Sequence, residues 1–335
     1  MRVVRILLAI ARHDYGKPEN GTSYEYNSWF NTLKVLGHEV HHFDTFDPEW
    51  GGDPDRAGRA LEATVAEIAP DLVLMMLIER DVAVESIDRI RRTTAIANWF
   101  SDDTWRFRAF SSRIAHHFSW VVTTSRLGEA GYRRLGVPAV YSAWGYDEGL
   151  YHPVPEVEPT IDVGFVGQRY GRRGDVIQSL IDQGFSVVAR GSGWPGGRID
   201  DADLASQYAS TRINLNFLES SAGPFQRRGI TIRGSWRADR LITHRFAPPT
   251  QLKARPFEIT ACGGFLLTND APELREFFDL DREVGIFADE RALPERIRYF
   301  LQHPDERQAI ANAGLQRSKE YSWPTVLSTI LEQMC

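Results

Sequence analysis

The sequence predicts an α/β protein built from two successive doubly wound, Rossmann-like domains. Three observations favour this class. Apolar runs of strand length alternate with segments of helical character, a proline-rich stretch interrupts them near the middle of the chain, and the alternation then starts again. Such alternation is typical of parallel sheets with helices on both faces. A chain of 335 residues is also longer than one ordinary hydrophobic core requires, which favours two domains.

The first half contains the strands and helices of one such domain. We expect strands at residues 3–9, 40–43, 72–77, 95–100, 120–123 and 139–144. We expect helices at residues 23–36, 55–68, 82–91, 107–118 and 127–135. Residues 152–160 (HPVPEVEPT) have the proline-rich, acidic composition of a linker. The first domain is therefore predicted to span residues 1–155.

The alternation of strands and helices restarts after this linker and predicts a second domain at residues 156–320. Its expected strands are residues 161–166, 186–189, 213–217, 265–268 and 284–287. Its expected helices are residues 176–182, 204–211, 272–278 and 292–302. In the last segment, 321–335, apolar residues recur at helical spacing: Trp323, Val326, Leu327, Ile330, Leu331 and Met334. This stripe predicts a helix that packs on a domain, or alternatively a dimerisation helix.

Composition excludes several classes of function. Hydrophobic content of 42% and charged content of 25% indicate a folded chain without long disordered regions. A net charge of −6 argues against binding to nucleic acid or to an anionic membrane surface. No apolar run approaches the ~18 residues of a membrane span. Cys262 and Cys335 do not make a disulfide framework and fit a reducing compartment, so we expect a cytoplasmic protein.

Residues 253–270 (KARPFEITACGGFLLTND) contain an unusual charge pair on a short helix. Pro256 suits the first helical position. Glu258 follows Lys253 and Arg255 on the first turn, where a carboxylate can accept hydrogen bonds from a ribose diol while the two cations face a diphosphate. In the alternative interpretation, Glu258 complements the helix dipole and Arg255 lies on the surface. The residues alone favour neither interpretation.

The end of the same helix completes a recognisable pattern. Gly263 and Gly264 supply the positive φ angle that ends a helix. The pattern R-x-F-E-x-x-A-C-G-G-x-x-L-T, followed by Pro-Glu-Leu at 272–274 and then by Phe287, resembles the C-terminal signature of glycosyltransferases of the GT-B fold. It is most similar to the spore-maturation (CgeB-like) branch of the group 1 enzymes.

The resemblance implies a fold, an activity and a role for one residue. The implied fold is GT-B, with two facing Rossmann-like domains, a last helix that crosses back to the first domain, and a site in the cleft between them. The implied role of Glu258 is to bind the ribose of a nucleotide-sugar donor. The commoner group 1 pattern has another glutamate eight residues earlier, where this chain has Thr250.

Further donor-binding candidates follow the first two strands of the second domain. The strand at 161–166 leads into Gly167 and a basic loop with Arg169. In GT-B transferases this loop neutralises the donor diphosphate, and a helix N-terminus with an arginine suits that anion. Trp194, in a glycine-rich turn after the next strand, can stack on or border the base. The alternative is a turn without a ligand.

Candidates in the first domain follow its first strand. His13 is the side chain there that best titrates near neutral pH, and Tyr15 and Gly16 can contact a sugar or acceptor. A solvated loop before a capped helix is the alternative interpretation. Asp147 resembles the aspartate of a group 1 G-V-D pattern near the end of the domain and is assigned to sugar or acceptor. A simple turn residue is the alternative for Asp147.

Asp102 and Asp103 follow the fourth strand and allow three interpretations. They can bind a metal, bind sugar or act as a general base, or cap the next helix. A metal needs more converging ligands than this local pair, so no metal site is predicted. CgeB-like relatives also carry an aspartate pair here, so Asp103 is assigned with His13 to catalysis and Asp102 to sugar or acceptor.

Residues 225–255 form a long connection rich in arginine. The arginines are Arg227, Arg228, Arg233, Arg237, Arg240, Arg245 and Arg255, interleaved with Trp236 and Phe246. Loops of this length are usually functional or mobile, and we interpret this one as a lid over donor or acceptor.

The sequence therefore predicts a glycosyltransferase that moves a sugar from a nucleotide-diphosphate donor to an acceptor glycan, glycoside or other hydroxyl compound. Cations that act on the leaving diphosphate make metal and cofactor unnecessary. The group 1 resemblance implies retention of configuration. A sugar-nucleotide epimerase or hydrolase of the same fold, or a non-catalytic nucleotide-sugar-binding module, remains as the alternative. The sequence predicts no oligomeric state.

Overall fold

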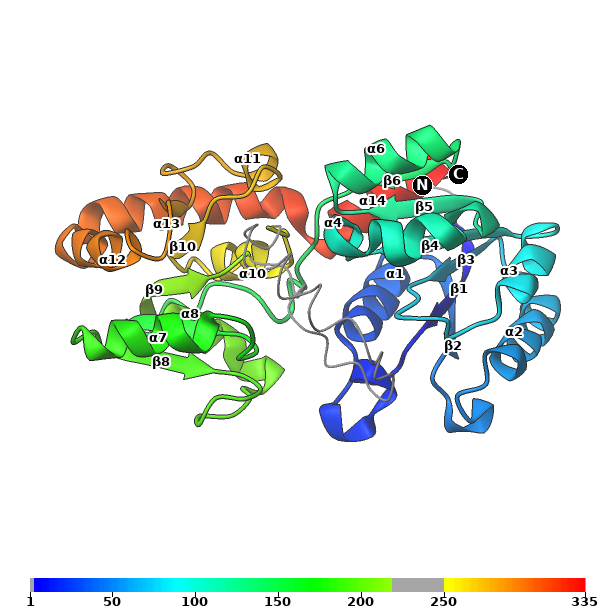
Figure 1. The fold of residues 1–335 in the computed structure, drawn as a ribbon, viewed down its shortest axis with the longest axis horizontal. Coiled ribbons are helices and arrows are strands. Elements are labelled where there is room, and N and C mark those ends of the chain that lie inside the picture. The colour runs from blue at the N-terminus through cyan, green and yellow to red at the C-terminus, as the bar shows by residue number, and fades with distance from the viewer. Residues whose placement is uncertain (1–2, 219–249, 335) are drawn as a thin grey trace, which may run out of the picture. The chain divides into compact units, whose positions relative to one another are not determined.

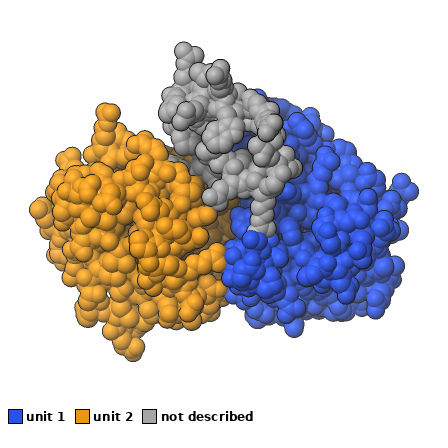
Figure 2. Space-filling model, turned by 60° about the horizontal axis from the view of Figure 1, so that its bottom comes forward, with its two compact units in different colours: residues 1–143, 323–335 blue, residues 144–322 orange. Residues whose placement is uncertain are grey.

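The computed structural model describes residues 3–218 and 250–334 and divides the chain into two compact units (Figures 1 and 2). Unit 1 consists of residues 1–143 and 323–335, and unit 2 of residues 144–322. The proline-rich segment expected as a linker thus belongs to unit 2. Most of the arginine-rich segment interpreted as a lid, residues 225–249, lies outside the described residues.

Unit 1 is built on a parallel sheet. Its strands are β1 (Arg5–Ile10), β2 (Glu39–Asp44), β3 (Leu72–Met75), β4 (Ala95–Phe100), β5 (Trp120–Thr123) and β6 (Ala139–Tyr141). In the described residues they follow the order β2-β1-β3-β4-β5-β6, and every pairing is parallel. The central strands are buried on both faces, as their nearly continuous apolar sequences require.

Helices connect these strands, and α2 and α6 carry clear start or stop signals. They are α1 (Asn31–Val35), α2 (Pro54–Ile68), α3 (Val84–Arg91), α4 (Asp103–Arg106), α5 (Ser112–Ile114) and α6 (Arg126–Leu135). Asp53 caps α2 by accepting a hydrogen bond from the Asp55 N–H at 2.9 Å, and Pro54 occupies its first turn. Gly136, with φ of 69°, ends α6.

Two connections differ from the regular helices expected there. Residues Tyr26–Phe30 and Phe107–Ser111 are π-helical, so the predicted helices at 23–36 and 107–118 are each broken into shorter pieces. Such π-helical turns occur mostly as single bulges and often lie near functional sites. Sequence periodicity does not distinguish them from an ordinary helix.

Unit 2 repeats the plan with a second parallel sheet. Its strands are β7 (Ile161–Val166), β8 (Val187–Arg190), β9 (Thr211–Asn216), β10 (Leu266–Asn269) and β11 (Gly285–Phe287). Among described residues their order is β11-β10-β9-β7-β8, again with parallel pairing throughout. The prediction of two Rossmann-like α/β units is confirmed.

The helices of unit 2 include one that the sequence did not reveal. They are α7 (Arg173–Asp182), α8 (Leu204–Ala209), α10 (Arg255–Ala261), α11 (Leu274–Phe277), α12 (Leu293–Gln302) and α13 (Pro304–Ser318). No helix was predicted at α13, whose buried face consists mainly of small residues: Ile310, Ala311, Gly314 and Ser318. Its side chains form no continuous apolar stripe, so the usual signal of an amphipathic helix is missing.

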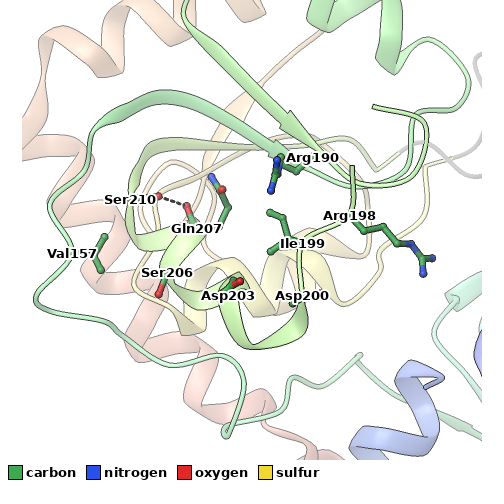
Figure 3. A pocket seen from close by; sticks show the side chains of 9 residues that line it. All are labelled: Val157, Arg190, Arg198, Ile199, Asp200, Asp203, Ser206, Gln207 and Ser210. Carbon is green, nitrogen blue, oxygen red and sulfur yellow. Dashed lines mark hydrogen bonds between the residues drawn. The ribbon is translucent and has the colours of Figure 1, made fainter. Parts of the chain in front are cut away.

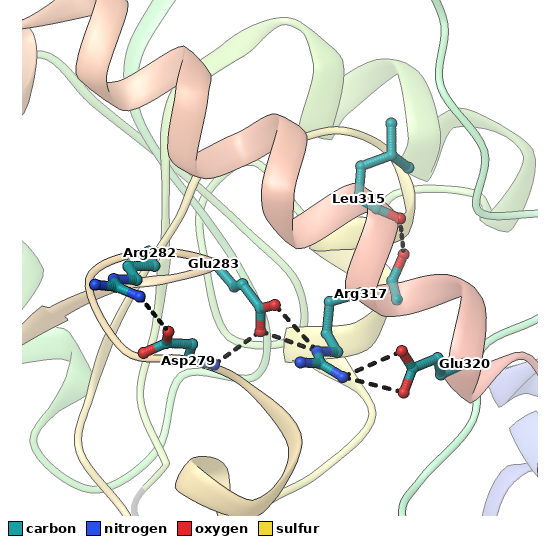
Figure 4. Close-up of polar contacts among 7 residues, drawn as sticks. Asp279, Arg282, Glu283, Leu315, Arg317 and Glu320 are labelled. Atoms are coloured by element: carbon teal, nitrogen blue, oxygen red, sulfur yellow. Dashed lines mark hydrogen bonds and ion pairs between the residues drawn. The ribbon is translucent and has the colours of Figure 1, made fainter.

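Ion pairs and close backbone packing hold α13 against the turn before β11 (Figure 4). The Arg317 guanidinium donates to the Glu283 carboxylate at 3.0 Å and to Glu320 at 3.1 Å. A side chain at Gly314 would collide with the Glu283 carbonyl oxygen, so glycine permits this approach. The short side chains that hide α13 from sequence analysis are therefore what lets it pack closely.

The last helix, α14 (Trp323–Met334), packs within unit 1 around three buried tryptophans. Trp29, Trp99 and Trp323 have ring centroids 5.0–5.9 Å apart, and each side chain is at most 1% exposed. The Trp323 Nε1–H donates to the Tyr24 hydroxyl at 3.2 Å. The predicted apolar stripe faces inward, since Val326, Leu327, Ile330 and Leu331 are also buried.

None of the helices in the described ranges combines the length and the hydrophobicity that crossing a bilayer requires.

Trp323→Ala is expected to destabilise unit 1 by about 3–5 kcal/mol, because it removes a large side chain from a closely packed aromatic cluster. Urea unfolding of the full chain, followed by circular dichroism, measures the change. Glu332→Ala, on the exposed face of the same helix, serves as the control and should change stability by no more than about 0.5 kcal/mol. Equal stability of wild type and Trp323→Ala would contradict the proposed anchoring of α14.

Candidate functional site

The carboxyl edge of the unit 2 sheet brings together Gly167, Arg169 and Trp194. Gly167 follows β7, and its N–H donates to the Arg190 carbonyl at the end of β8 at 2.9 Å. The Trp194 Nε1–H donates to the Gly167 carbonyl at 2.8 Å. A side chain at Gly191 would strike the Gly167 backbone. The turn after β8 therefore supports the turn after β7.

Trp194 is held mainly by protein contacts. Its ring lies 5.8 Å from that of Phe165, and the Arg169 guanidinium lies 5.3 Å from its centroid. Through these contacts and its hydrogen bond to Gly167, the indole joins the turn after β8 to the turn after β7. Residues 191–196 have the letters G-x-G-x-x-G, but they follow the second strand of the unit, whereas the dinucleotide fingerprint follows the first.

Two arginines mark the start of α7. The Arg169 side chain is exposed, and the Arg169 backbone N–H donates to the Ser192 carbonyl at 2.9 Å. Arg173, the first residue of α7, donates to the carbonyls of Gln168 at 3.2 Å and Phe217 at 2.9 Å. Arg173 thus joins the ends of the neighbouring strands β7 and β9. Sequence analysis assigned Arg173 no role, because its carbonyl partner at Phe217 is distant in the chain.

Helix α10 begins and ends as its sequence predicts. Pro256 lies in its first turn, and Gly263 follows its end with φ of 71°. An added Cβ at Gly264 would lie 2.9 Å from the Asn214 amide nitrogen. Both glycines are therefore explained by the turn and by packing on β9.

Inside α10, Glu258 and Arg255 form a largely buried charge pair. Their Oε2 and Nη1 atoms are 3.2 Å apart, and the side chains are 4% and 30% exposed. Arg255 also donates to the Tyr208 hydroxyl. Burial raises the pKa of the Tyr208 phenol, so this hydroxyl stays protonated. The nearby phenol and carboxylate raise the pKa of Arg255 despite its burial, so the guanidinium stays charged beside Glu258.

The remaining unit 2 candidates have identifiable local contacts. The Lys253 ammonium lies 5.5 Å from the centroid of the Trp144 ring. Asp147 accepts a hydrogen bond from the Gly149 N–H at 2.8 Å, and its carbonyl accepts from Tyr151 at 2.8 Å. This is the geometry of the turn that was the alternative for Asp147.

In unit 1, His13, Tyr15 and Gly16 lie in the loop after β1. The Gly16 N–H donates to the His13 carbonyl at 2.8 Å, so this amide is used within the loop. A Cβ at Gly16 would lie 2.6 Å from the Phe46 ring, which explains the glycine. Tyr15 adopts a left-handed conformation with φ of 54° and is 59% exposed. The loop therefore presents the Tyr15 ring to solvent.

The two aspartates after β4 have different environments. Asp103 is 1% exposed and accepts hydrogen bonds from the Thr123 hydroxyl at 2.7 Å and the Tyr132 hydroxyl at 2.8 Å. An added Cβ at Gly128 would lie 2.8 Å from Asp103, so α6 packs directly over the carboxyl group. Burial raises the pKa of Asp103 to about 6. Asp102 is partly exposed and makes no side-chain cap of α4.

The structure also reveals a carboxylate that sequence analysis did not select. Asp81 lies in the loop after β3 and accepts hydrogen bonds from the backbone N–H groups of Ile78 at 2.7 Å and Glu79 at 3.2 Å. Burial raises the pKa of Asp81 to about 6. The segment Glu79-Arg80-Asp81 has no motif, so only the folded loop marks this residue.

A polar pocket of about 400 Å³ lies beside α8 in unit 2 (Figure 3). Its lining residues are Val157, Arg190, Arg198, Ile199, Asp200, Asp203, Ser206, Gln207 and Ser210. None of the predicted donor-binding residues lines it. In the described ranges, His, Cys, Asp and Glu side chains form no group of three that could hold a metal ion.

Comparison with known proteins identifies the second half of the chain. Residues 172–332 match a family model described as glycosyl transferase-like. This segment is a glycosyltransferase family domain. It includes α10 with Arg255 and Glu258, and it begins one residue before α7. The predicted relationship to glycosyltransferases is confirmed at the level of this group 1-like family. No curated protein matches the chain.

Solved structures match almost the whole chain. Sucrose-phosphate synthase from Thermosynechococcus elongatus aligns with a TM-score of 0.68 at 12% identity, covering 98% of this chain and 99% of that one. HepE from Anabaena, in complex with UDP-glucose, aligns with a TM-score of 0.66 at 13% identity over 98% and 99%. A glycosyltransferase from Rickettsia africae aligns with a TM-score of 0.67 at 12% identity over 99% and 98%. The predicted GT-B fold is confirmed.

Asp103→Asn is expected to change how stability depends on pH. The pKa of Asp103 is raised in the folded state from 3.8 to about 6, so the folded protein binds this proton more tightly than the unfolded chain. Asp103 therefore lowers the free energy of unfolding by up to about 3 kcal/mol as the pH rises from about 3 to about 7. Urea unfolding of wild type and Asp103→Asn at several pH values measures this difference. Parallel pH profiles in the two proteins would contradict the raised pKa.

Proposed function

We propose that this protein transfers a sugar from a nucleotide-diphosphate-sugar donor to the hydroxyl group of an acceptor. The observation that carries the proposal is the Glu258–Arg255 pair in the glycosyltransferase family domain. A buried carboxylate is costly unless it is paired or binds a ligand, and Glu258 has Arg255 as its partner at 3.2 Å. A carboxylate can accept hydrogen bonds from both hydroxyl groups of a ribose. The signature around Glu258 further supports membership of the CgeB-like branch.

The donor diphosphate is assigned to the start of α7. Arg169 is exposed beside Gly167, and α7 begins close by at Arg173. A helix N-terminus and an exposed guanidinium both favour an anion. Lys253 is the second cation that we assign to the diphosphate. Arg255, which donates to Tyr208 and pairs with Glu258, supports the ribose-binding carboxylate.

These cations have a chemical role in the transfer. Negative charge develops on the diphosphate as its bond to the sugar breaks, and a cation fixed nearby stabilises that charge in the transition state. We therefore propose that the transfer reaction does not require a metal ion. Retention of configuration comes from the group 1 resemblance alone, and the anomer of the product, measured by NMR, tests it separately.

A nucleotide panel tests the donor site. UDP-, GDP-, dTDP- and ADP-sugars are added without metal in a thermal-shift assay, with UDP-glucose first because HepE from Anabaena binds it. One nucleotide family should stabilise wild type, by about 2.7 kcal/mol at a concentration of 100 Kd. Glu258→Ala should abolish the stabilisation by removing the ribose contact.

The assay compares, for each protein, the melting temperature with and without nucleotide. This is necessary because Glu258→Ala leaves the Arg255 charge without its partner and therefore also lowers the melting temperature of the protein without nucleotide. Glu295→Ala, which removes an exposed glutamate of the same unit, is the matched control and should respond to nucleotide like wild type. No shift of wild type with any nucleotide sugar at saturating concentration would refute the donor site.

The role of the cations predicts a second result. Once a donor is known, release of nucleoside diphosphate should proceed at the same rate with and without EDTA. Arg169→Ala should slow release by about 10²–10³-fold, the range found when one group that stabilises transition-state charge is removed. Loss of activity in EDTA that is restored by Mg²⁺ or Mn²⁺ would show that a metal carries the charge.

A further inference from the structure

The carboxyl ends of β1, β3 and β4 in unit 1 carry a mixed group of side chains. These three strands are neighbours in the sheet (Figure 1). The strand order reverses between β1 and β3, since β2 lies on one side of β1 and all later strands on the other. In open parallel sheets, ligands bind outside the carboxyl ends of the strands at such a reversal. Tyr15 follows β1 and Asp81 follows β3, so both flank this position.

Asp81 is held in place by its own loop. The Asn98 side chain of β4 accepts a hydrogen bond from the Leu77 N–H at 3.0 Å and fixes the start of the loop. The Ile78 and Glu79 N–H groups then donate to the Asp81 carboxylate at 2.7 Å and 3.2 Å. The side chain remains partly exposed. A carboxylate with fixed orientation and remaining acceptor capacity is suited to a ligand hydroxyl.

Charged groups of unit 1 act on both Asp81 and Tyr15. Arg106 of α4 lies close enough to act electrostatically on both Asp81 and the Tyr15 phenol, and Asp102 acts on the same phenol. The exposed Tyr15 ring, in the loop after the neighbouring strand β1, offers an apolar face. Sugars combine an apolar ring face with hydroxyls at the edge, so this combination fits a sugar better than a lipid chain or a phosphate.

We propose that Asp81 binds the acceptor by accepting a hydrogen bond from a hydroxyl group of an acceptor sugar, with the Tyr15 ring packed against that sugar. The proposal rests on the transferase function and adds to it the class of the acceptor and a residue that orients it. By contrast, the Asp103 carboxyl is enclosed by Thr123, Tyr132 and α6, and bonds inside the protein.

The proposal predicts a direction of pH dependence. Burial raises the pKa of Asp81 to about 6, the Glu79 charge adds to this effect, and the two backbone N–H groups and the Arg106 charge oppose it. The carboxylate is the form that accepts a hydrogen bond, so binding is complete above the pKa and is lost as the pH falls through it. About a tenth of such a group is ionised at pH 5, so sugar affinity should fall roughly tenfold between pH 7.5 and pH 5.

Saturation-transfer NMR on the full chain, without nucleotide, tests the subsite. The probes are the methyl α- and β-glycosides of glucose, galactose and mannose. At least one should bind wild type at pH 7.5 and bind about tenfold more weakly at pH 5. Asp81→Asn should bind this probe weakly at both pH values, and Tyr15→Ala should weaken binding while leaving the pH dependence unchanged.

Glu79→Gln is the matched control. It removes a charge from the same loop but keeps the backbone N–H that holds Asp81, so at pH 7.5 it should bind the probe like wild type. The proposal is overturned if Asp81→Asn binds as tightly as wild type, if Glu79→Gln weakens binding equally, or if no glycoside binds wild type.

The two proposals fail in distinguishable ways. Sugar binding that depends on Asp81, in a protein that no nucleotide sugar stabilises, would keep the subsite and refute the transferase function. Stabilisation by a nucleotide sugar through Glu258, in a protein that binds the glycosides equally with and without Asp81, would keep the donor site and refute the subsite.

Discussion

The arrangement of both units depends on the parallel pairing of their strands. Parallel neighbours need a crossover on each connection, so every strand of a sheet ends at the same edge. Loops that are distant in sequence therefore meet there. In unit 1 this edge collects Tyr15, Asp81 and Asp102, and in unit 2 it collects Gly167, Trp194 and the start of α7. One geometric constraint thus supplies two candidate ligand sites, and the loop sequences decide what each can bind.

The buried carboxylates of the two units show how differently the same group can be used. Glu258 is paired with a charged partner, Arg255, at 3.2 Å. Asp103 accepts hydrogen bonds from the hydroxyls of Thr123 and Tyr132, and burial raises its pKa. The first arrangement keeps a charged acceptor near a sheet edge, as binding a diol requires. The second joins α4, β5 and α6 through one side chain. Its assignment to catalysis stays a prediction, as does that of His13.

The sequence was most informative where a single local segment determines the structure. Apolar periodicity predicted the parallel sheets, and the segment around Glu258 predicted a helix that begins near Pro256 and ends at Gly263. Features that depend on distant partners were not predictable. Asp81 becomes distinctive only when Ile78 and Glu79 turn their N–H groups toward it, and α13 is hidden because it packs through small residues such as Gly314. A sequence motif indicates local chemistry, whereas the burial of a side chain depends on residues from the whole fold.

The membership of α14 in unit 1 has a consequence for the order in which the protein is made. Unit 2 is one continuous stretch of chain, but the tryptophan cluster of unit 1 lacks Trp323 until the ribosome has completed unit 2. During synthesis, Trp29 and Trp99 lack this partner until residues 144–322 have been made. Until then the nascent first half exposes apolar surface, which favours aggregation and binding to chaperones.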